Sequence, residues 1–352
     1  MIRELSIQNF KSLENVKIEL GKINVLVGPN GSGKTAIIES LLLIRNLVSK
    51  ILGMSPFGLW WGYDNVVFSK DLGRNIVIEI NSDEFYYLLE VHRERFVKEI
   101  LMMKDLNLER SEDKVIINNE EYKGLNEEYS ALNLVNLARL PRDKVMVLNS
   151  VYNFLTGIMV LRVDPYEAIS PIHASEITAI DINGRGMVKV LHNLYSEGNL
   201  PGYIDEFLKE EGYSISFKLS DEGNVILYVN DHGVIVPPPS VPSGLIKMLT
   251  IMTALALKPK ILAIDEVENS LHLKYIERLL DVFDYFSNDT QIILSTHSPA
   301  VIDLVKPSYL VLVSKEGLST KVRRVNKKDE ELKEFLVKNG ITLSDAYFYG
   351  AI

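Results

Sequence analysis

The chain has 352 residues, with 38 basic against 47 acidic side chains and a formal net charge of −9. It contains no cysteine, which excludes disulfides, thiolate metal sites and cysteine nucleophiles, and its acidic balance does not favour a broad nucleic-acid-binding surface. The first twenty residues carry charges throughout, and the most apolar long stretch, residues 145–163, includes Asn149, Asn153 and Arg162. Neither segment is typical of a secretion leader or a membrane span, so we expect a cytoplasmic protein with no membrane partner.

Three short strands and a helix are predicted at the start of the chain. Residues 2–9 and 16–20 have the composition of strands and are joined by residues 10–13, with the sequence FKSL. A third apolar run, residues 23–27, leads into a glycine-rich segment, after which residues 36–52 repeat apolar side chains at helical spacing. This order of elements is typical of a nucleotide-binding domain.

The glycine-rich segment between the third strand and the helix, residues 28–35, has the sequence GPNGSGKT. Glycines let the backbone take turns that a side chain would block, so successive N–H groups can point at phosphate oxygens. Lys34 adds a positive charge that reaches the β- and γ-phosphates, and the Thr35 hydroxyl suits the accompanying Mg²⁺. A glycine-rich turn without a ligand is the simpler alternative, which the flanking strand and helix disfavour. The predicted nucleotide-binding residues are Asn30, Gly31, Ser32, Gly33, Lys34 and Thr35.

The middle of the chain, residues 53–240, is predicted to be a peripheral insertion of antiparallel strands and helices. A loop around Trp60 and Trp61 carries exposed or interfacial aromatic side chains. Alternating apolar residues predict strands over 76–80, 85–92, 97–103, 114–118 and 145–148, and a hairpin of 214–219 with 225–229. Helical spacing predicts helices over 125–140, 187–195 and 204–211. No motif in this region indicates a chemical function.

Strands and helices alternate from residue 241 onwards. The pattern predicts a helix over 243–257, a strand over 261–264, a helix over 271–286, a strand over 291–294 and a helix over 299–305. Such alternation implies an α/β arrangement, in which helices cover both faces of a parallel sheet.

Two of these strands lead into side chains suited to chemistry. Residues 261–266 have the sequence ILAIDE, so Asp265 and Glu266 lie at the carboxyl end of a strand, where an open parallel sheet places its ligands. Asp265 can hold the Mg²⁺ shell, and Glu266 can take a proton from an attacking water. His297 follows the next strand and can hydrogen-bond a γ-phosphate or that water. The simpler alternatives are a solvated acidic strand end and a structural histidine.

These motifs resemble those of the ABC-type ATPases, specifically the soluble branch of RecF-like, SMC-like and OLD-like proteins. Residues 28–35 are similar to the Walker A motif, 261–266 to Walker B with its catalytic glutamate, 268–272 to the D-loop and 295–299 to the switch-histidine segment. Residues 10–13 also resemble the short N-terminal loop of that branch, and residues 342–352 resemble its usual C-terminal segment. The resemblance covers both ends of the chain well and the middle poorly.

The resemblance implies an α/β P-loop NTPase fold. It predicts an ABC-ATPase-like head, with a mixed sheet core covered by helices, and an inserted α+β or helical subdomain. Residues 1–52 would form the N-terminal part of the head with Walker A, residues 53–240 the peripheral strands and helical insertion, and residues 241–352 the part with signature, Walker B and switch histidine. Lys11, in the N-terminal loop, joins the predicted nucleotide-binding residues.

Residues 241–247, with the sequence VPSGLIK, stand where that family has its signature motif. Ser243 and Gly244 open a helix whose N-terminus suits an anion, and in such ATPases this helix faces the γ-phosphate of a second subunit. Taken alone, the pair is an ordinary helix cap. The motif lacks the Leu-Ser-Gly-Gly-Gln form of transporter subunits. The family's Q-loop glutamine is also missing, and Asn149 or Ser150, after the predicted strand 145–148, is the candidate replacement.

The function implied by the resemblance is Mg²⁺-dependent ATP binding and hydrolysis by a nucleotide-dependent, head-to-tail homodimer. Lys34, Glu266 and His297 would be catalytic, and Thr35 and Asp265 would hold Mg²⁺. DNA and a separate nuclease or effector protein are further candidate partners, in DNA repair, maintenance or defence. Only about 55 residues follow His297, too few for a typical nuclease domain. The alternatives are a nucleotide-gated interaction module with negligible turnover and, less favoured, a transporter ATPase subunit.

Overall fold

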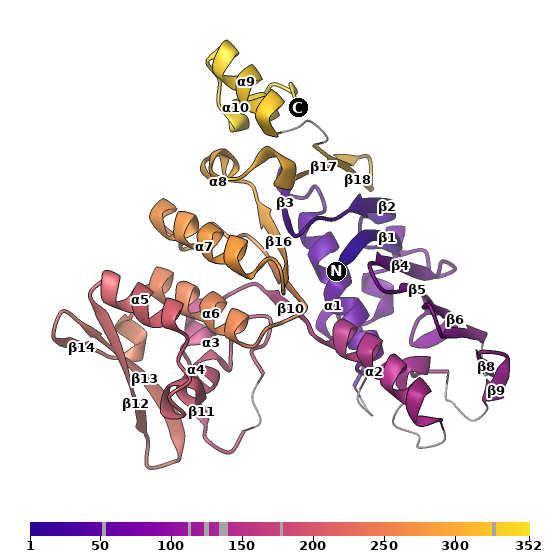
Figure 1. The fold of residues 1–352 in the computed structure, drawn as a ribbon, viewed down its shortest axis with the longest axis horizontal. Helices are drawn as coiled ribbons and strands as arrows, with labels where there is room; N and C mark the ends of the chain where they lie inside the picture. The colour runs from indigo at the N-terminus through magenta and orange to yellow at the C-terminus, as the bar shows by residue number, and fades with distance from the viewer. Residues whose placement is uncertain (51–53, 112–113, 123–126, 134–139, 177–178, 326–328) are drawn as a thin grey trace. The chain divides into compact units, whose positions relative to one another are not determined.

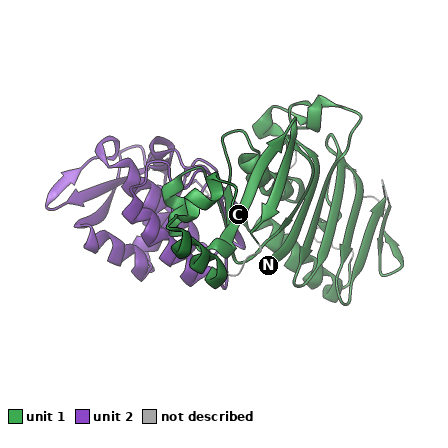
Figure 2. Ribbon diagram, turned by 90° about the horizontal axis from the view of Figure 1, so that it is seen from above, with its two compact units in different colours: residues 1–158, 291–352 green, residues 159–290 purple. Residues whose placement is uncertain are grey.

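The computed structural model describes residues 1–50, 54–111, 114–122, 127–133, 140–176, 179–325 and 329–352 (Figure 1). The chain divides into two compact units, of which unit 1 comprises residues 1–158 and 291–352 and unit 2 comprises residues 159–290 (Figure 2). The chain thus leaves unit 1 once and returns to it at Gln291. The predicted domain boundaries at residues 52 and 240 are based on the positions of the sequence motifs and not on compact units, and they stay a prediction.

Unit 1 contains an antiparallel sheet of eight strands in the order β2-β1-β4-β5-β6-β7-β8-β9 (Figure 1). The strands are β1 (Ile2–Phe10), β2 (Leu13–Glu19), β4 (Ile76–Ser82), β5 (Tyr86–His92), β6 (Arg95–Met102), β7 (Asn107–Ser111), β8 (Lys114–Ile117) and β9 (Glu120–Tyr122). Buried residues alternate with more exposed ones along β5 and β7, because successive side chains of a strand point to opposite faces and one face is covered. The same alternation in the sequence correctly predicted β4, β5, β6 and β8.

A buried polar cluster joins three strands of this sheet, β5, β6 and β7, to residues 130–131. Glu99 on β6 is fully buried and accepts hydrogen bonds from the Tyr87 hydroxyl, the Ser130 hydroxyl and the Ala131 N–H, each at 2.6 Å. Arg110 on β7 is also fully buried and lies 4.0 Å from Glu99. Burial raises the pKa of Glu99, and these donors and the guanidinium oppose that rise. The cluster therefore fixes residues 130–131 against the sheet.

The second group of strands in unit 1 holds the glycine-rich segment. β3 (Ile23–Val27) lies between β16 (Gln291–Thr296) and β17 (Leu310–Glu316) and is parallel to both, while β18 (Ser319–Arg324) pairs with β17 in antiparallel fashion. Every residue of β3 and β16 is buried, as expected for strands covered on both faces. The predicted mixed sheet is present, and it places an N-terminal strand between two C-terminal ones.

Helices complete unit 1. They are α1 (Lys34–Val48), α2 (Arg142–Thr156), α8 (Pro299–Leu304), α9 (Asp329–Asn339) and α10 (Leu343–Phe348), with 3-10 turns at Gly58–Trp60, Tyr63–Asn65, Phe68–Lys70 and Pro307–Tyr309. Most of α1 is buried, including its apolar run over residues 41–44 and the polar residues Lys34, Glu39 and Ser40.

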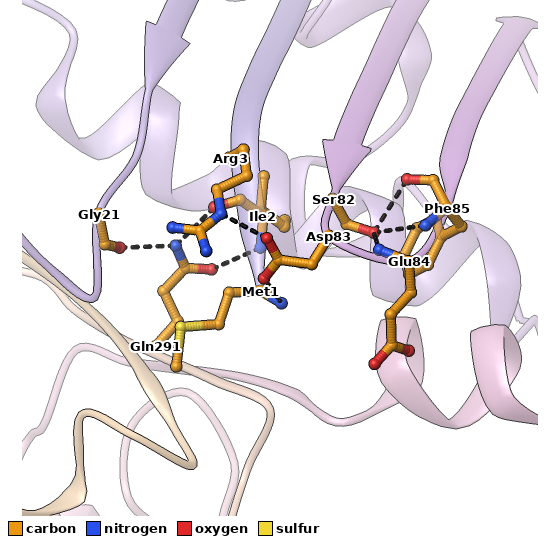
Figure 3. Close-up of polar contacts among 9 residues, drawn as sticks. All are labelled: Met1, Ile2, Arg3, Gly21, Ser82, Asp83, Glu84, Phe85 and Gln291. Carbon is orange, nitrogen blue, oxygen red and sulfur yellow. Dashed lines mark hydrogen bonds and ion pairs between the residues drawn. The ribbon is translucent and has the colours of Figure 1, made fainter.

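Gln291, the first residue of β16, ties that strand to the start of the chain (Figure 3). Its Nε2 donates to the carbonyl groups of Ile2, at 2.8 Å, and Gly21, at 2.7 Å, and its Oε1 accepts from the Ile2 N–H at 3.0 Å. Both polar atoms of this buried amide are satisfied, as burial requires. The link fixes β16, which leads to His297, relative to β1.

Unit 2 consists of helices around short strands. Its elements are β10 (Ile158–Leu161), α3 (Pro165–Ala168), β11 (Ile172–His173), α4 (Met187–Ser196), α5 (Gly202–Glu210), β12 (Tyr213–Leu219), β13 (Asn224–Asp231), β14 (Val234–Val236), a 3-10 turn (Pro238–Ser240), α6 (Ser243–Ala256), β15 (Ile261–Ile264) and α7 (Leu273–Phe286). β13 pairs with β11, β12 and β14, and β15 lies beside β10. The predicted hairpin of β12 and β13 and helices α4 to α7 are present.

The prediction of a strand over residues 145–148 is wrong, because these residues belong to α2. The buried residues of α2 are Leu148, Val151 and Leu155, spaced by three and four, so the segment buries a helical stripe. A short apolar run fits both periods, and only its length and packing decide between them. Strands β7, β9, β10, β11, β14, β17 and β18 were not predicted. Half of the predicted helix over 125–140, residues 125–126 and 134–139, lies outside the described residues, and residues 127–130 are not helical.

Candidate active site

The glycine-rich segment, residues 28–35, connects β3 to α1. Gly33 precedes α1 with a φ of 112°, a value that L side chains avoid, and a Cβ on it would lie 2.1 Å from Thr320 Oγ1. A Cβ on Gly28 would lie 2.1 Å from the Val313 carbonyl oxygen. Glycine at both positions therefore lets the loop pass directly against β17 and β18.

Lys34 folds back over the start of this loop. Its ammonium donates to the carbonyl groups of Gly28, at 2.7 Å, and Pro29, at 3.0 Å, and only 6% of the residue is exposed. A positive charge is thus held beside the first residues of the loop. A phosphate oxygen would be a stronger partner for it than these neutral carbonyl groups.

Hydroxyl groups from two distant segments brace the loop. The Thr320 hydroxyl on β18 hydrogen-bonds the Ser32 carbonyl, at 2.9 Å, and the Ser12 hydroxyl, at 2.8 Å. The Ser32 hydroxyl is buried and has no hydrogen-bond partner among the described residues, which fits a loop with room for a polar ligand. Sequence reasoning missed Thr320, because an isolated threonine in a strand belongs to no motif.

Lys11, a predicted nucleotide contact, lies in the turn after β1 with a φ of 53°. Its ammonium pairs with the buried carboxylate of Glu39 on α1 and lies 5.5 Å from the centre of the Trp60 ring. In the neighbouring aromatic loop Trp61 is 92% exposed, as predicted, while Trp60 packs edge-on against Phe10. These contacts place Lys11 beside α1, and its part in nucleotide binding stays a prediction.

A pocket of about 460 Å³ opens beside the loop within unit 1. It is lined by the end of β3, the first three loop residues up to Asn30, His297, and Tyr347 and Phe348 of α10. His297 follows β16, which runs parallel to β3, so both strands deliver their carboxyl ends to the same edge. The structure thus brings two predicted residues, Asn30 and His297, to one pocket. It adds two aromatic residues from a helix that no sequence motif connected with the loop.

In unit 2, β15 leads into the predicted acidic pair. Asp265 is only 4% exposed, and its Oδ2 accepts hydrogen bonds from Nε of Arg162, at 3.1 Å, and from Nη2, at 2.9 Å. Arg162 follows β10, and the Asp265 N–H donates to the Leu161 carbonyl of that strand at 2.8 Å. The guanidinium compensates the buried negative charge. Sequence reasoning missed this role of Arg162, because the pairing of β10 with β15 is a tertiary contact.

Glu266 is held in a strained conformation by its neighbours. Its φ is 51°, in the left-handed region, and its Oε2 accepts from Asn269 Nδ2 at 2.6 Å. The Glu266 carbonyl accepts from the ammonium of Lys247 on α6 at 2.8 Å, and the same ammonium donates to the Asn269 carbonyl at 2.9 Å. Lys247 is 1% exposed, and burial lowers its pKa to about 8 against the pull of nearby carboxylates. This lysine therefore joins α6 to the turn after β15.

The predicted signature residues begin α6. Ser243 is exposed, no side-chain cap covers the helix start, and a Cβ on Gly244 would lie 2.8 Å from the Ser270 carbonyl oxygen. Glycine thus permits close contact between the start of α6 and the segment that resembles the D-loop. Within unit 2, the structure brings the signature residues and the segment after β15 together.

The candidate replacement of the Q-loop glutamine rested on a strand that does not exist. Asn149 and Ser150 lie in the middle of α2, where the Ser150 hydroxyl donates to the Val147 carbonyl of its own helix at 2.7 Å. Neither residue follows a strand end, so their assignment is withdrawn.

The donors predicted for Mg²⁺ have suitable chemistry. Thr35, near the start of α1, offers a hydroxyl, and Asp265, at the end of β15, offers a buried carboxylate. Hard oxygen ligands of these kinds are those that Mg²⁺ prefers, usually with few protein ligands besides phosphate and water. Each residue therefore offers the chemistry of a Mg²⁺ ligand, and their joint role stays a prediction.

Residues 23–303 match the family model AAA_21, described as "AAA domain, putative AbiEii toxin, Type IV TA system". A segment of 44 residues is 41% identical to an OLD nuclease of Thermus scotoductus, covering 12% of this chain and 8% of the nuclease. The chain thus matches a small part of that relative's length.

Two solved structures of SMC heads share the fold. An SMC head bound to the C-terminal winged-helix domain of ScpA has a TM-score of 0.55 at 15% identity, covering 94% of this chain and 99% of that chain. An SMC head with an extended coiled coil, bound to the C-terminal domain of ScpA and derived from Pyrococcus furiosus, has a TM-score of 0.53 at 14% identity, covering 96% of this chain and 98% of that chain.

Among the helices that the structure describes, none combines the length and the apolar composition that crossing a membrane would need. The matched family model spans most of the chain, including the loop before α1 and the acidic end of β15, and the SMC heads share its architecture. The chain therefore belongs to the AAA_21 family of AAA-domain ATPases, and it shares the fold of the SMC heads.

Proposed function

We propose that this ATPase hydrolyses ATP with Mg²⁺ and that two copies close head to tail around the nucleotide. The observation that carries the proposal is the buried Lys34 ammonium, held beside a glycine loop whose neighbouring pocket also contains His297. A buried cation and an imidazole beside a glycine loop at a helix start suit the binding of a triphosphate.

Each residue has a role in this proposal. Lys34 neutralises charge on the β- and γ-phosphates, and the N–H groups from Asn30 to Thr35 hold the phosphates in place. Thr35 and Asp265 would hold Mg²⁺, which when bound neutralises phosphate charge. Glu266 takes the proton of the attacking water, and His297 hydrogen-bonds that water or the terminal phosphate. Phosphoryl transfer needs mainly this positioning and charge compensation.

In the proposed dimer, the second copy contacts the nucleotide with its signature residues. Ser243 is exposed at the uncapped start of α6, whose partial positive charge favours an anion, and Asn30 is exposed on the phosphate loop. Each copy would present its α6 start to the nucleotide on the other copy's loop, which gives two equivalent sites. Lys11 is proposed to support the nucleotide from the turn after β1.

We propose further that ATP turnover serves DNA repair, maintenance or defence in the cytoplasm, through a partner protein. Two comparisons support this proposal: the matched SMC heads are bound to a domain of ScpA, and the matched relative is a nuclease. DNA and a separate nuclease or effector are the partners to test, by binding across a salt series with and without ATP.

The experiment that tests the activity is steady-state hydrolysis of ATP by wild type and by Lys34→Ala. We expect turnover to fall at least about a hundredfold, because the phosphates lose their fixed counter-charge. Lys333→Ala, on the exposed surface of α9, is the control and should retain turnover. Unchanged hydrolysis in Lys34→Ala would refute the site. Nucleotide binding without turnover, with and without DNA, would instead identify a nucleotide-gated interaction module.

A further inference from the structure

The C-terminal helix α10 is attached firmly beside the pocket. Asp303 of α8 accepts hydrogen bonds from the Ser344 N–H, at 2.7 Å, and the Ser344 hydroxyl, at 2.9 Å. Thr342 and Asp345 form a capping box at the start of α10. Because α8 begins two residues after His297, the Asp303–Ser344 contact fixes α10 relative to that histidine. Helix α10 is therefore a built wall of the pocket rather than a loose end.

Another part of the pocket wall is the part of the loop that holds the Lys34 ammonium. Gly28 and Pro29 line the pocket, and their carbonyl groups are the acceptors of that ammonium. A phosphate drawn to Lys34 would therefore lie at the edge of the pocket that Tyr347 and Phe348 line. Tyr347 can donate one hydrogen bond from its hydroxyl, whereas Phe348 offers only apolar surface.

We propose that Tyr347 binds the terminal phosphate of ATP through its hydroxyl. The inference rests on the proposed function, since it needs a nucleotide on the loop. Burial raises the pKa of Tyr347, so its hydroxyl keeps its proton and stays a donor at neutral pH. The Tyr347 hydroxyl would donate to the γ-phosphate, which ATP has and ADP lacks. Tyr347 would thus be a residue that distinguishes triphosphate from diphosphate.

The test compares nucleotide affinities of the full chain by calorimetry. In Tyr347→Phe, we expect affinity for a non-hydrolysable ATP analogue to fall about tenfold, the usual effect of losing a hydrogen bond to a charged group. Affinity for ADP should change less than about twofold. Tyr349→Phe removes the same hydroxyl from an 81% exposed residue after α10, and it should match wild type with both nucleotides. An equal loss for both nucleotides, or no loss for either, overturns the proposal.

A second measurement uses the unmodified chain. Amide hydrogen exchange of residues 343–349 should slow with the ATP analogue and stay unchanged with ADP, and equal behaviour with both nucleotides overturns the proposal.

The variant Lys34→Ala separates failure of the Tyr347 role from failure of the proposed function. If Lys34→Ala loses nucleotide binding while Tyr347→Phe keeps its preference for ATP, the proposed role of Tyr347 is refuted and the proposed function stands. If wild type binds neither nucleotide, the proposed function falls as well.

Discussion

Gly33 meets two constraints that a side chain cannot satisfy together. Its φ is 112°, and the space where a Cβ would stand is taken by the Thr320 side chain at 2.1 Å. Gly31, two residues earlier, has a φ of 77°, but nothing lies within 4 Å of its missing Cβ. Gly31 is therefore favoured by its backbone conformation alone, whereas Gly33 is required both by its backbone conformation and by its contact with Thr320.

Replacing these glycines should separate the two effects. We expect Gly33→Ala to lower the free energy of unfolding by at least about 2 kcal/mol and to abolish nucleotide binding, because strain and overlap with Thr320 both displace the loop. Gly31→Ala is the matched control and should cost about 1 kcal/mol, from its backbone conformation alone. Urea unfolding and nucleotide titration measure both. Similar losses in the two variants would show that contact with Thr320 is unimportant.

Residues of the candidate site could be predicted where they belong to a motif of neighbouring residues. Lys34 and Thr35 follow from the loop pattern, and Asp265 with Glu266 follows from an apolar strand that ends in carboxylates. Thr320, Arg162 and Tyr347 were not predictable, since each reaches its partner across a long stretch of chain. Single polar or aromatic residues of these kinds occur throughout any sequence.

Helix α6 acts on the acidic segment through one side chain. Lys247 donates to the carbonyl groups of both Glu266 and Asn269, at 2.8 and 2.9 Å, from a position that is 1% exposed. The start of the same helix carries Ser243 and Gly244. The helix that begins with the signature residues therefore also holds the turn that carries Glu266.

Lys247→Met should remove a specific pH dependence of stability. Burial lowers the Lys247 pKa from its ordinary 10.5 to about 8. Between these values the unfolded chain holds a proton that the folded chain lacks, so unfolding free energy rises with pH, by up to about 3 kcal/mol. Wild type should show this rise relative to Lys247→Met in urea unfolding from pH 8 to 10.5. Lys209→Met, with its side chain 73% exposed on α5, is the control. Equal slopes in all three proteins would contradict the prediction.

Element types were predictable where a pattern was long or bounded by clear end signals. The alternation in β4 to β6 and the apolar strands β3 and β15 agree with their sequences, whereas residues 145–148 do not. That short apolar run satisfies helix and strand periods equally, and packing of Leu148, Val151 and Leu155 makes it helical.

The candidate site residues are divided between the two compact units. Unit 1 carries Lys34, Thr35 and His297, while unit 2 carries Asp265 and Glu266 with the start of α6. A mechanism that closes two copies around nucleotide makes assembly depend on ATP, because each copy would supply phosphate contacts to the other. Hydrolysis would then release the pair.

Glu266→Gln should trap this assembled state. Without the carboxylate that accepts the water's proton, bound ATP persists, so we expect a mass of twice 39.8 kDa in light scattering at saturating ATP and Mg²⁺. Wild type with ADP should have the mass of one chain. Glu277→Gln, on the exposed face of α7, makes the same chemical change outside the site and should behave as wild type. A variant that stays monomeric with ATP would refute the head-to-tail dimer.

The sequence by itself determined the nucleotide loop, the acidic strand end, the class of fold and the kinship with ABC-type ATPases. These features depend on residues that lie close together in the chain, so their spacing and backbone requirements can be recognised in a short stretch of sequence. Only the tertiary structure decided that α10 lines the pocket beside His297, that Arg162 compensates Asp265 and that Lys247 joins α6 to Glu266. Each of these contacts depends on strand pairing and helix packing between distant segments, and no local pattern encodes which distant residue will fill the space.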